Sequence, residues 1–242
     1  EILIGLVGSE MCIRDRRLLE LFDEQIELAH AGKPCGVFLK TNSVTDKEII
    51  EKIVEASQAN VPVNMLVRGI SCIVPGIPGY TDNVRVVSIV GRLLEHSRIY
   101  LFGTPDNVQH LYMSSADLMT RNMDKRVEIM WPIKNKDLQT RVLDYIDKSM
   151  HDNVKLRELQ PDRTYTPLGY FAKAGEPLLN SQEYFIKKAY DDEAAAAKRD
   201  EKEAEELDPY NRIPMAAKGV VSVVAPVAKD ADGTESADEN DS

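Results

Sequence analysis

The sequence predicts an α/β sandwich with a mixed sheet, and two observations support that fold class. Segments rich in β-branched and aromatic residues interleave with segments whose apolar residues recur at helical spacing. One continuous apolar run, at 61–67, has the length and composition of a strand buried on both faces. Strands and helices that alternate in this way pack as a sheet covered by helices.

The first half of the chain contains two predicted helices and two predicted strands. They are helix 17–31, strand 35–40, a helix between Thr45 and Asn60, and strand 61–67. Thr45 and Glu48 form a capping box that opens the second helix. The buried strand delivers Arg68 at its carboxyl end, where open α/β sheets place ligand-binding groups.

The second half begins with a loop, because closely spaced Pro-Gly pairs exclude a regular element after Arg68. Four further strands are predicted at 84–90, 98–102, 110–114 and 126–133, with a hairpin loop at 103–106. An apolar stripe predicts a helix over 136–150. A surface helix over 181–207 and a disordered acidic tail over 208–242 are expected to follow, and the main domain is assigned to 35–180.

Residues 1–16 do not fit this pattern. Their apolar start precedes the arginines, which is the reverse of the order in a signal peptide. The string GLVGSEMCIRDR matches the translation of a transposase-based sequencing adapter. We therefore interpret 1–16 as an artefactual leader on a chain truncated at its N-terminus; the alternative is a natural strand with a capping loop. Segment 17–34 would then be the end of a preceding domain or a connecting helix.

Composition excludes several classes of protein. The apolar fraction of 43% is typical of a globular domain, and no apolar run approaches the roughly 20 residues of a spanning helix. Three cysteines without a C-x-x-C pair exclude a disulfide scaffold and a zinc ribbon. The formal net charge of -10 lies almost wholly in the last part of the chain, since 191–242 carry -9 and the middle of the chain is neutral. Overall acidity is therefore no argument against an anionic substrate.

Arginine dominates the cations between positions 68 and 126. The set comprises Arg68, Arg85, Arg92, Arg98, Arg121 and Arg126, with Lys125 the exception. Arginine is favoured where a planar, bidentate contact with phosphate or carboxylate is needed. Arg68 ends one predicted strand and Arg126 begins another, which singles these two out. The alternative is that each arginine pairs with a nearby acid on a solvated face.

Among the four histidines, His96 is the candidate functional one. It precedes a predicted strand, and Arg98 follows two residues later. The alternative is an ordinary hydrogen-bonding histidine, as we expect for His30, His110 and His151. No serine or cysteine is placed for a nucleophilic triad, and no Walker loop is present.

Three long strings carry a resemblance to a known family. They are KTNSVTDKEII, NMLVRGISCIVPGIPGYTDNVRVVSIVGRLLEHSRIYLF and LYMSSADLMTRNMDKRVEIMWPI. Over 33–167 the chain resembles the C-terminal part of the bacterial ATP-dependent polyphosphate kinases. The resemblance implies a phospholipase-D-like fold, with 35–180 as the second of two such domains. In that fold His96-Ser97-Arg98 matches a His-x-Lys motif and 114–117 matches a Gly-Ser-x-Asn motif, with Arg and Asp as departures.

The resemblance also implies roles for individual residues. Arg68, His96, Arg98, Ser115 and Asp117 are expected to contact nucleotide or phosphate, with His96 and Arg126 taking part in catalysis. The reaction implied is reversible transfer of the ATP γ-phosphate to the end of inorganic polyphosphate, through a phosphohistidine that this chain does not contain. Mg²⁺ would accompany ATP, and we expect its ligands outside this chain.

Two other functions stay open at this point. One is a phospholipase-D-like phosphodiesterase, which the His-x-Arg departure disfavours; the other is a non-catalytic module that binds polyanions. ATP or ADP and polyphosphate are the expected partners, with no nucleic acid and with assembly as a homo-oligomer. The expected location is the cytoplasm, with peripheral attachment to the membrane left open and no transmembrane segment.

Overall fold

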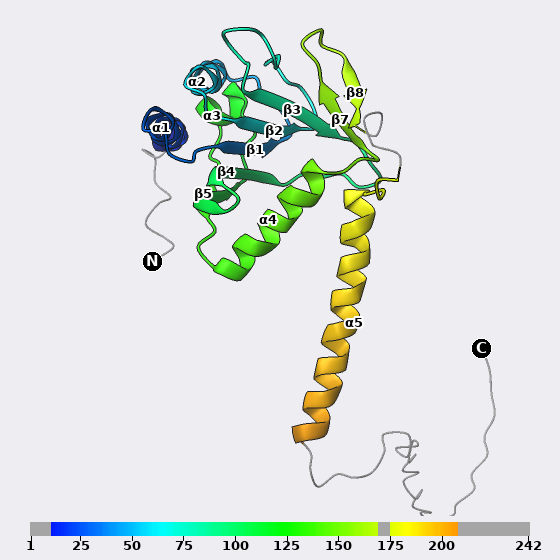
Figure 1. Ribbon diagram of the computed structural model, residues 1–242. Helices are drawn as coiled ribbons and strands as arrows, with labels where there is room; N and C mark the ends of the chain where they lie inside the picture. Colours follow the sequence, from blue (N-terminus) through cyan, green and yellow to red (C-terminus); the bar gives the residue numbers. More distant parts are fainter. Residues whose placement is uncertain (1–10, 169–174, 208–242) are drawn as a thin grey trace, which may run out of the picture. The chain divides into compact units, whose positions relative to one another are not determined.

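The computed structural model describes residues 11–168 and 175–207 (Figure 1). Most of the interpreted leader and the whole of the acidic tail lie outside these ranges. Helix α1 spans Met11–His30, so the first helix begins earlier than the predicted position 17. No helix in the described ranges is long and apolar enough to cross a membrane.

One eight-stranded sheet organises the fold, in the order β6-β5-β4-β1-β2-β3-β7-β8. Strands β1, β2 and β3 pair in parallel, and the other neighbours pair antiparallel. The predicted α/β class with a mixed sheet is therefore confirmed. The strands are β1 Val37–Thr41, β2 Val63–Val67, β3 Val84–Ile89, β4 Arg98–Thr104, β5 Asn107–Ser114, β6 Met130–Pro132, β7 Leu156–Leu159 and β8 Tyr165–Pro167.

Helices cover both faces of the sheet (Figure 1). Along β1, alternate side chains enter two separate hydrophobic clusters. Leu39 joins the cluster that contains residues of α1 and of α2, which spans Lys47–Gln58. Phe38 joins the opposite cluster with Ile146 of α4, which spans Lys136–Met150 as predicted. The strands in the middle of the sheet are thus buried on both sides, as the run at 61–67 indicated.

Two local predictions need correction. The cap of α2 is Asp46, whose carboxylate accepts a hydrogen bond from the Ile49 backbone at 3.2 Å; Thr45 does not form the predicted capping box. The strand predicted over 126–133 is only β6, because its partner β5 ends at Ser114 and leaves 126–129 without a ladder to join. A short helix, α3 (Thr120–Lys125), precedes this segment, and β7 and β8 were not predicted from the sequence.

Helix α5 (Ser181–Leu207) begins inside the folded body, although the sequence suggested a surface helix. Ser181 and Gln182 are buried, and the residues to Tyr190 belong to the same compact unit as the sheet. The described residues from Asp191 to Leu207 belong to a second unit. The start of α5 is therefore structural, and only its later part has the exposed character that the sequence indicated.

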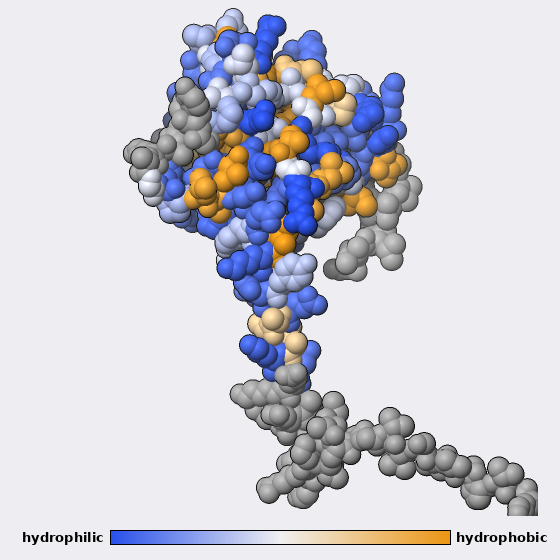
Figure 2. Space-filling view, turned by 90° about the vertical axis from the view of Figure 1, so that its right-hand side faces the viewer, coloured by the Kyte–Doolittle hydropathy of each residue, from blue (hydrophilic) through white to orange (hydrophobic). Residues whose placement is uncertain are grey.

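Apolar residues also reach the surface. On the face shown in Figure 2 they are set among hydrophilic residues. Scattered exposure of this kind is normal and does not by itself indicate a binding surface.

Candidate functional site

The candidate site lies at one edge of the sheet, where several strand ends meet. Arg68 directly follows β2, and Arg98 is the first residue of β4. Because β4 runs antiparallel to β1, its amino end lies beside the carboxyl end of β1, where Thr41 and Asn42 are found. Ser114 pairs with Arg98 in the sheet register and brings the segment 115–117 to the same edge.

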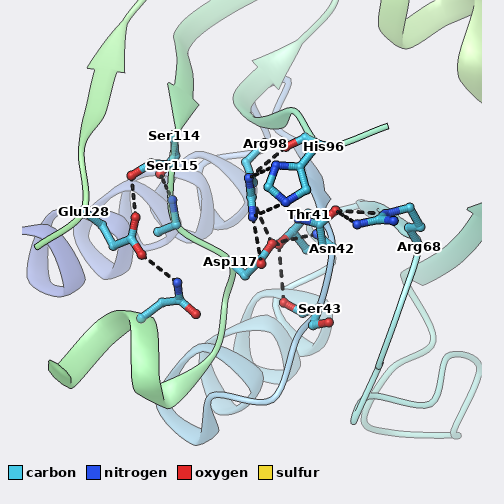
Figure 3. Close-up of polar contacts among 12 residues, drawn as sticks. Thr41, Asn42, Ser43, Arg68, His96, Arg98, Ser114, Ser115, Asp117 and Glu128 are labelled. Atoms are coloured by element: carbon cyan, nitrogen blue, oxygen red, sulfur yellow. Dashed lines mark hydrogen bonds and ion pairs between the residues drawn. The ribbon is translucent and has the colours of Figure 1, made fainter. Parts of the chain in front are cut away.

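Arg98 holds His96 through a forked set of contacts (Figure 3). Its Nη1 lies 2.9 Å from His96 Nδ1 and donates to the His96 carbonyl oxygen at 2.8 Å. A guanidinium can only donate, so we assign the closer ring nitrogen, Nδ1, as the acceptor, which places the proton of the neutral ring on Nε2. The 3.4 Å approach of Arg98 Nη2 to Nε2 is then a contact between donors, and within the described residues Nε2–H has no acceptor.

The other side of the Arg98 guanidinium binds Asp117. Nε and Nη2 each donate to one carboxylate oxygen of Asp117 at 3.0 Å, in a bidentate pair of which both side chains are nearly buried. Asp117 also accepts from the Thr41 hydroxyl at 3.0 Å and the Asn42 backbone at 2.8 Å. Burial alone would raise the pKa of Asp117, but the Arg98 and Asn42 hydrogen bonds outweigh it and hold that pKa below its usual value.

These contacts bear on two predicted phosphate-binding residues. Asp117 accepts hydrogen bonds from Arg98, Thr41 and Asn42, and most donors of Arg98 are directed at Asp117 and His96. Asp117 thus holds Arg98 in place, and Arg98 in turn holds His96. The predicted contact of Arg98 and Asp117 with phosphate remains a prediction.

Arg68 is joined to this network through Asn42. Its Nε and Nη2 donate to Asn42 Oδ1 at 3.0 and 2.8 Å. Among the described residues no carboxylate pairs with Arg68, so its positive charge is not neutralised locally. Asn42 Nδ2 is buried without a hydrogen-bond partner in the structure. Arg68 and His96 are thus brought to one edge by a continuous chain of polar contacts, as Figure 3 shows.

Ser115, another predicted phosphate-binding residue, is engaged elsewhere. Its hydroxyl donates to Glu128 and accepts from the Ile129 backbone at 2.9 Å. Glu128 also accepts from Asn122 at 2.7 Å, which ties the segment after β5 to α3. Ser115 therefore fixes the loop between β5 and β6, and its predicted contact with phosphate is not tested by these bonds.

Arg126 does not begin a strand, in contrast to the sequence-based expectation. It is the C-cap residue of α3, in an extended conformation, and its side chain is exposed. Within the part of the chain that the structure describes, it forms no hydrogen bond or ion pair. The structure therefore does not join it to His96 and Arg68, and it does not assign it to the surface ion pairs either.

Two of the remaining histidines, His30 and His151, lie at helix ends as the sequence indicated, whereas His110 lies inside β5 and not at the start of a strand. His30 ends α1, and His151 caps α4 with its ring beside Asp147. His110 Nε2 lies 2.9 Å from Glu24, within an ordinary surface pair.

Sequence reasoning missed three residues that hold the site residues in place, namely Thr41, Asn42 and Lys40. Thr41 and Asn42 lie directly after a buried strand, and that position was a usable signal. Lys40, buried on the other face of β1, was not recognisable because a lysine in a strand usually indicates an exposed position. Burial lowers the pKa of Lys40, although the charge of Glu95 opposes this shift.

A metal ion finds no ready ligand set here. In the described ranges no three His, Cys, Asp or Glu side chains are grouped to hold one. The carboxylates of Asp117 and Glu128 are already occupied by hydrogen-bond donors from the protein. The described carboxylates at this edge therefore do not fit a Mg²⁺ site, and the expectation that Mg²⁺ accompanies ATP with ligands outside this chain stays a prediction.

A cavity of about 500 Å³ lies elsewhere, between the sheet and α4. Its lining includes Cys35, Leu101 and Met150, and none of the predicted site residues. The cavity is therefore separate from the candidate site.

Comparison with known proteins agrees with the family resemblance that the sequence indicated. Residues 6–182 match the family model of the polyphosphate kinase C-terminal domain 2. The chain is 48% identical to a polyphosphate kinase of Staphylococcus epidermidis over 76% of its own length and 24% of that protein. It is 44% identical to one of Lactiplantibacillus plantarum over 70% of its length and 23% of that protein. It thus spans about a quarter of these relatives.

A solved structure supports the same assignment. The polyphosphate kinase of Porphyromonas gingivalis superposes with a TM-score of 0.69 at 29% identity, over 75% of this chain and 27% of that one. A phospholipase D family member, Nuc of Salmonella typhimurium, is less similar, with a TM-score of 0.39. The resemblance noted in the sequence is confirmed: the chain belongs to the polyphosphate kinase C-terminal domain 2 family.

Proposed function

We propose that this chain supplies one wall of a site that transfers phosphoryl groups reversibly between ATP and the end of inorganic polyphosphate. The observation that carries the proposal is the chain of contacts from Arg68 through Asn42, Asp117 and Arg98 to His96. Among the described residues, this network places a cation without a carboxylate partner and an oriented imidazole at the same sheet edge. Family membership supports the choice of substrates.

Arg68 would bind the phosphate groups. Phosphoryl transfer spreads negative charge over the equatorial oxygens, so positioned cations supply much of the catalysis. Arg68 keeps one amide oxygen as its partner, which orients the guanidinium without cancelling its charge. Arg126, exposed and without a polar partner in the described ranges, would be a second cation for the same transition state.

His96 would assist departure of ADP. Because Nδ1 accepts a hydrogen bond from Arg98, the single N–H of the neutral ring is on Nε2. That N–H can donate to a bridging or leaving phosphate oxygen, which is a general-acid role. The phosphohistidine nucleophile and the Mg²⁺ ligands would belong to parts of the enzyme that this chain does not contain. We further expect a homo-oligomer located in the cytoplasm.

Binding of ADP and of long-chain polyphosphate to the chain, measured by isothermal titration calorimetry, tests this proposal. We expect Arg68→Ala to weaken binding of polyphosphate by about tenfold, the loss expected for a charge-assisted contact. Arg85→Ala is the matched control, since Arg85 pairs with Glu158 at 3.0 Å and should not contact the ligand. Equal effects of the two substitutions would contradict the assignment of Arg68.

A non-catalytic polyanion-binding role is the second candidate. It is favoured by one observation: the carboxylates at this edge are occupied, so among the described residues the edge offers cations and a proton donor but no free carboxylate. Phosphoryl transfer measured in a polyphosphate kinase that carries this domain separates the two. Binding that persists while His96→Ala leaves synthesis unchanged would favour the polyanion-binding role.

A further inference from the structure

The loop that carries His96 is held neither by regular secondary structure nor by its large apolar side chains. It joins β3 to β4 over residues 90–97 and contains no helix or strand. Its large apolar side chains do not anchor it, because Val90 and Leu94 are 71% and 73% exposed. The position of His96 must therefore depend on polar contacts.

Glu95, next to His96, receives contacts from three different elements. The Tyr145 hydroxyl of α4 donates to one carboxylate oxygen, and Gln182 Nε2 of α5 donates to the other at 2.9 Å. Lys40 Nζ of β1 lies 3.6 Å from the same carboxylate. Burial and the charge of Glu95 raise the pKa of Tyr145, so the hydroxyl stays protonated and keeps donating. Glu95 is thus a point where the sheet and two helices meet the loop.

Gln182 also binds the main chain of the loop. Its Oε1 accepts from Leu93 N at 2.9 Å, and its Nε2 donates to Leu93 O at 3.0 Å. The side-chain amide therefore pairs with Leu93 as a neighbouring strand would. A Cβ atom on Gly91 would lie 2.4 Å from Gln182 Oε1, so the loop needs glycine there for the amide to fit.

Gln182 is itself held in place at the start of α5. The buried carboxylate of Asp152 accepts from both the backbone and the hydroxyl of Ser181, each at 2.7 Å. One turn later the Phe185 ring packs against Tyr145, with ring centroids 5.4 Å apart. The amide of Gln182 consequently has little freedom to follow a moving loop.

The other flank of His96 is fixed from β1. Lys40 Nζ donates to the Ser97 carbonyl oxygen at 3.1 Å, while the same ammonium group faces Glu95. The residues on both sides of His96 are therefore held, and Arg98 orients its ring. A displacement of about 1 Å at a reacting group can lower the rate by about a hundredfold.

From this arrangement we propose that Gln182 and Glu95 form a clamp that positions His96 for phosphoryl transfer, so that the start of α5 is part of the support of the site. Gln182 and Glu95 are positioning residues, since they act through the loop and touch no reacting atom. The proposal rests on the proposed function of His96.

The first test uses Gln182→Ala in a polyphosphate kinase that carries this domain. We expect kcat to fall about tenfold while KM for ATP changes by less than about twofold, because the loss affects the position of His96 and not the binding cations. In the isolated chain, the Leu93 amide should exchange its hydrogen about tenfold faster. Gln139→Ala is the matched control, since Gln139 near the start of α4 donates to the Ile133 carbonyl oxygen at 2.7 Å.

The second test keeps the shape of the side chain. Gln182→Glu places a second carboxylate against Glu95 and removes the donor to Leu93 O, and we expect it to lower kcat at least as much as Gln182→Ala. Adding Glu95→Gln restores a donor between the two side chains, and kcat should recover at least about threefold. A double variant no better than Gln182→Glu would overturn the clamp.

These measurements distinguish a failure of the clamp proposal from a failure of the proposed function. If the unmodified enzyme makes no polyphosphate, the proposed function fails, and the Leu93 exchange rate still tests the clamp. If Gln182→Ala speeds exchange but leaves kcat unchanged, or changes kcat no more than Gln139→Ala does, the positioning role is overturned.

Discussion

Two arginines near the candidate site lie in contrasting surroundings. Arg98 is only 11% exposed at its side chain and has Asp117 on one side and His96 on the other. Arg126 is exposed at the end of α3, and no polar partner is found for it in the described part of the chain. A guanidinium that is bound on two sides by protein groups orients its neighbours, whereas one without a polar partner is available to an incoming anion. Position in the fold, rather than residue type, separates the two roles.

The largest expected effect is at the unpaired arginine. In a polyphosphate kinase that carries this domain, Arg126→Ala should lower turnover by about a thousandfold with folding intact, as for a cation that stabilises the transition state. Lys125→Ala, which removes the adjacent charge in the last turn of α3, is the control. Steady-state rates of polyphosphate synthesis measure both. A loss in turnover below about threefold would show that Arg126 is an ordinary surface cation.

At the paired arginine the main effect should be on stability. Asp117→Asn leaves the buried guanidinium of Arg98 without its counter-charge, and we expect a loss of about 3 kcal/mol in the free energy of unfolding at pH 7. The pKa of Asp117 is lowered by folding, so its stabilising contribution is complete above its unfolded pKa, near pH 4, and disappears as the pH falls through the folded pKa. The difference in free energy of unfolding between the unsubstituted chain and Asp117→Asn should therefore become smaller below about pH 4.

Urea unfolding at pH 7, 5 and 3 measures this difference, with Asp124→Asn on the exposed side of α3 as the control. The paired role of Asp117 would be wrong if the gap stayed constant across that range.

The sequence predicted the parts of the site that depend on a single element. The run at 61–67 placed Arg68 at the end of a buried strand, and the stripe over 136–150 gave the bounds of α4. The composition of segment 126–129 predicts a strand. Strand formation also needs a partner, however, and β5 ends at Ser114. Composition alone does not show where a neighbouring strand stops.

Contacts between distant elements were out of reach for the same reason. The clamp on Glu95 joins β1, α4 and α5, whose contributing residues are 55, 50 and 87 positions away in the sequence. No spacing rule connects such positions, since they meet only after the helices pack on the sheet. Gly91 is the one residue of the loop whose type reflects the clamp. The reason for a glycine there is apparent only from its contact with Gln182.

The smallest expected effect tests whether the fork of Arg98 is needed or only its charge. Arg98→Lys keeps a cation beside Asp117, so we expect a loss of only about 1 kcal/mol in unfolding free energy. One ammonium group cannot bind Asp117 bidentately and also reach His96 Nδ1, so the ring should no longer be confined to the Nε2–H form. The ¹⁵N shifts of labelled His96 report this directly, and Arg85→Lys is the control. If His96 kept a single tautomer in Arg98→Lys, the orientation of its ring would have to come from the loop clamp alone, and the contrast between the two arginines would lose its functional meaning.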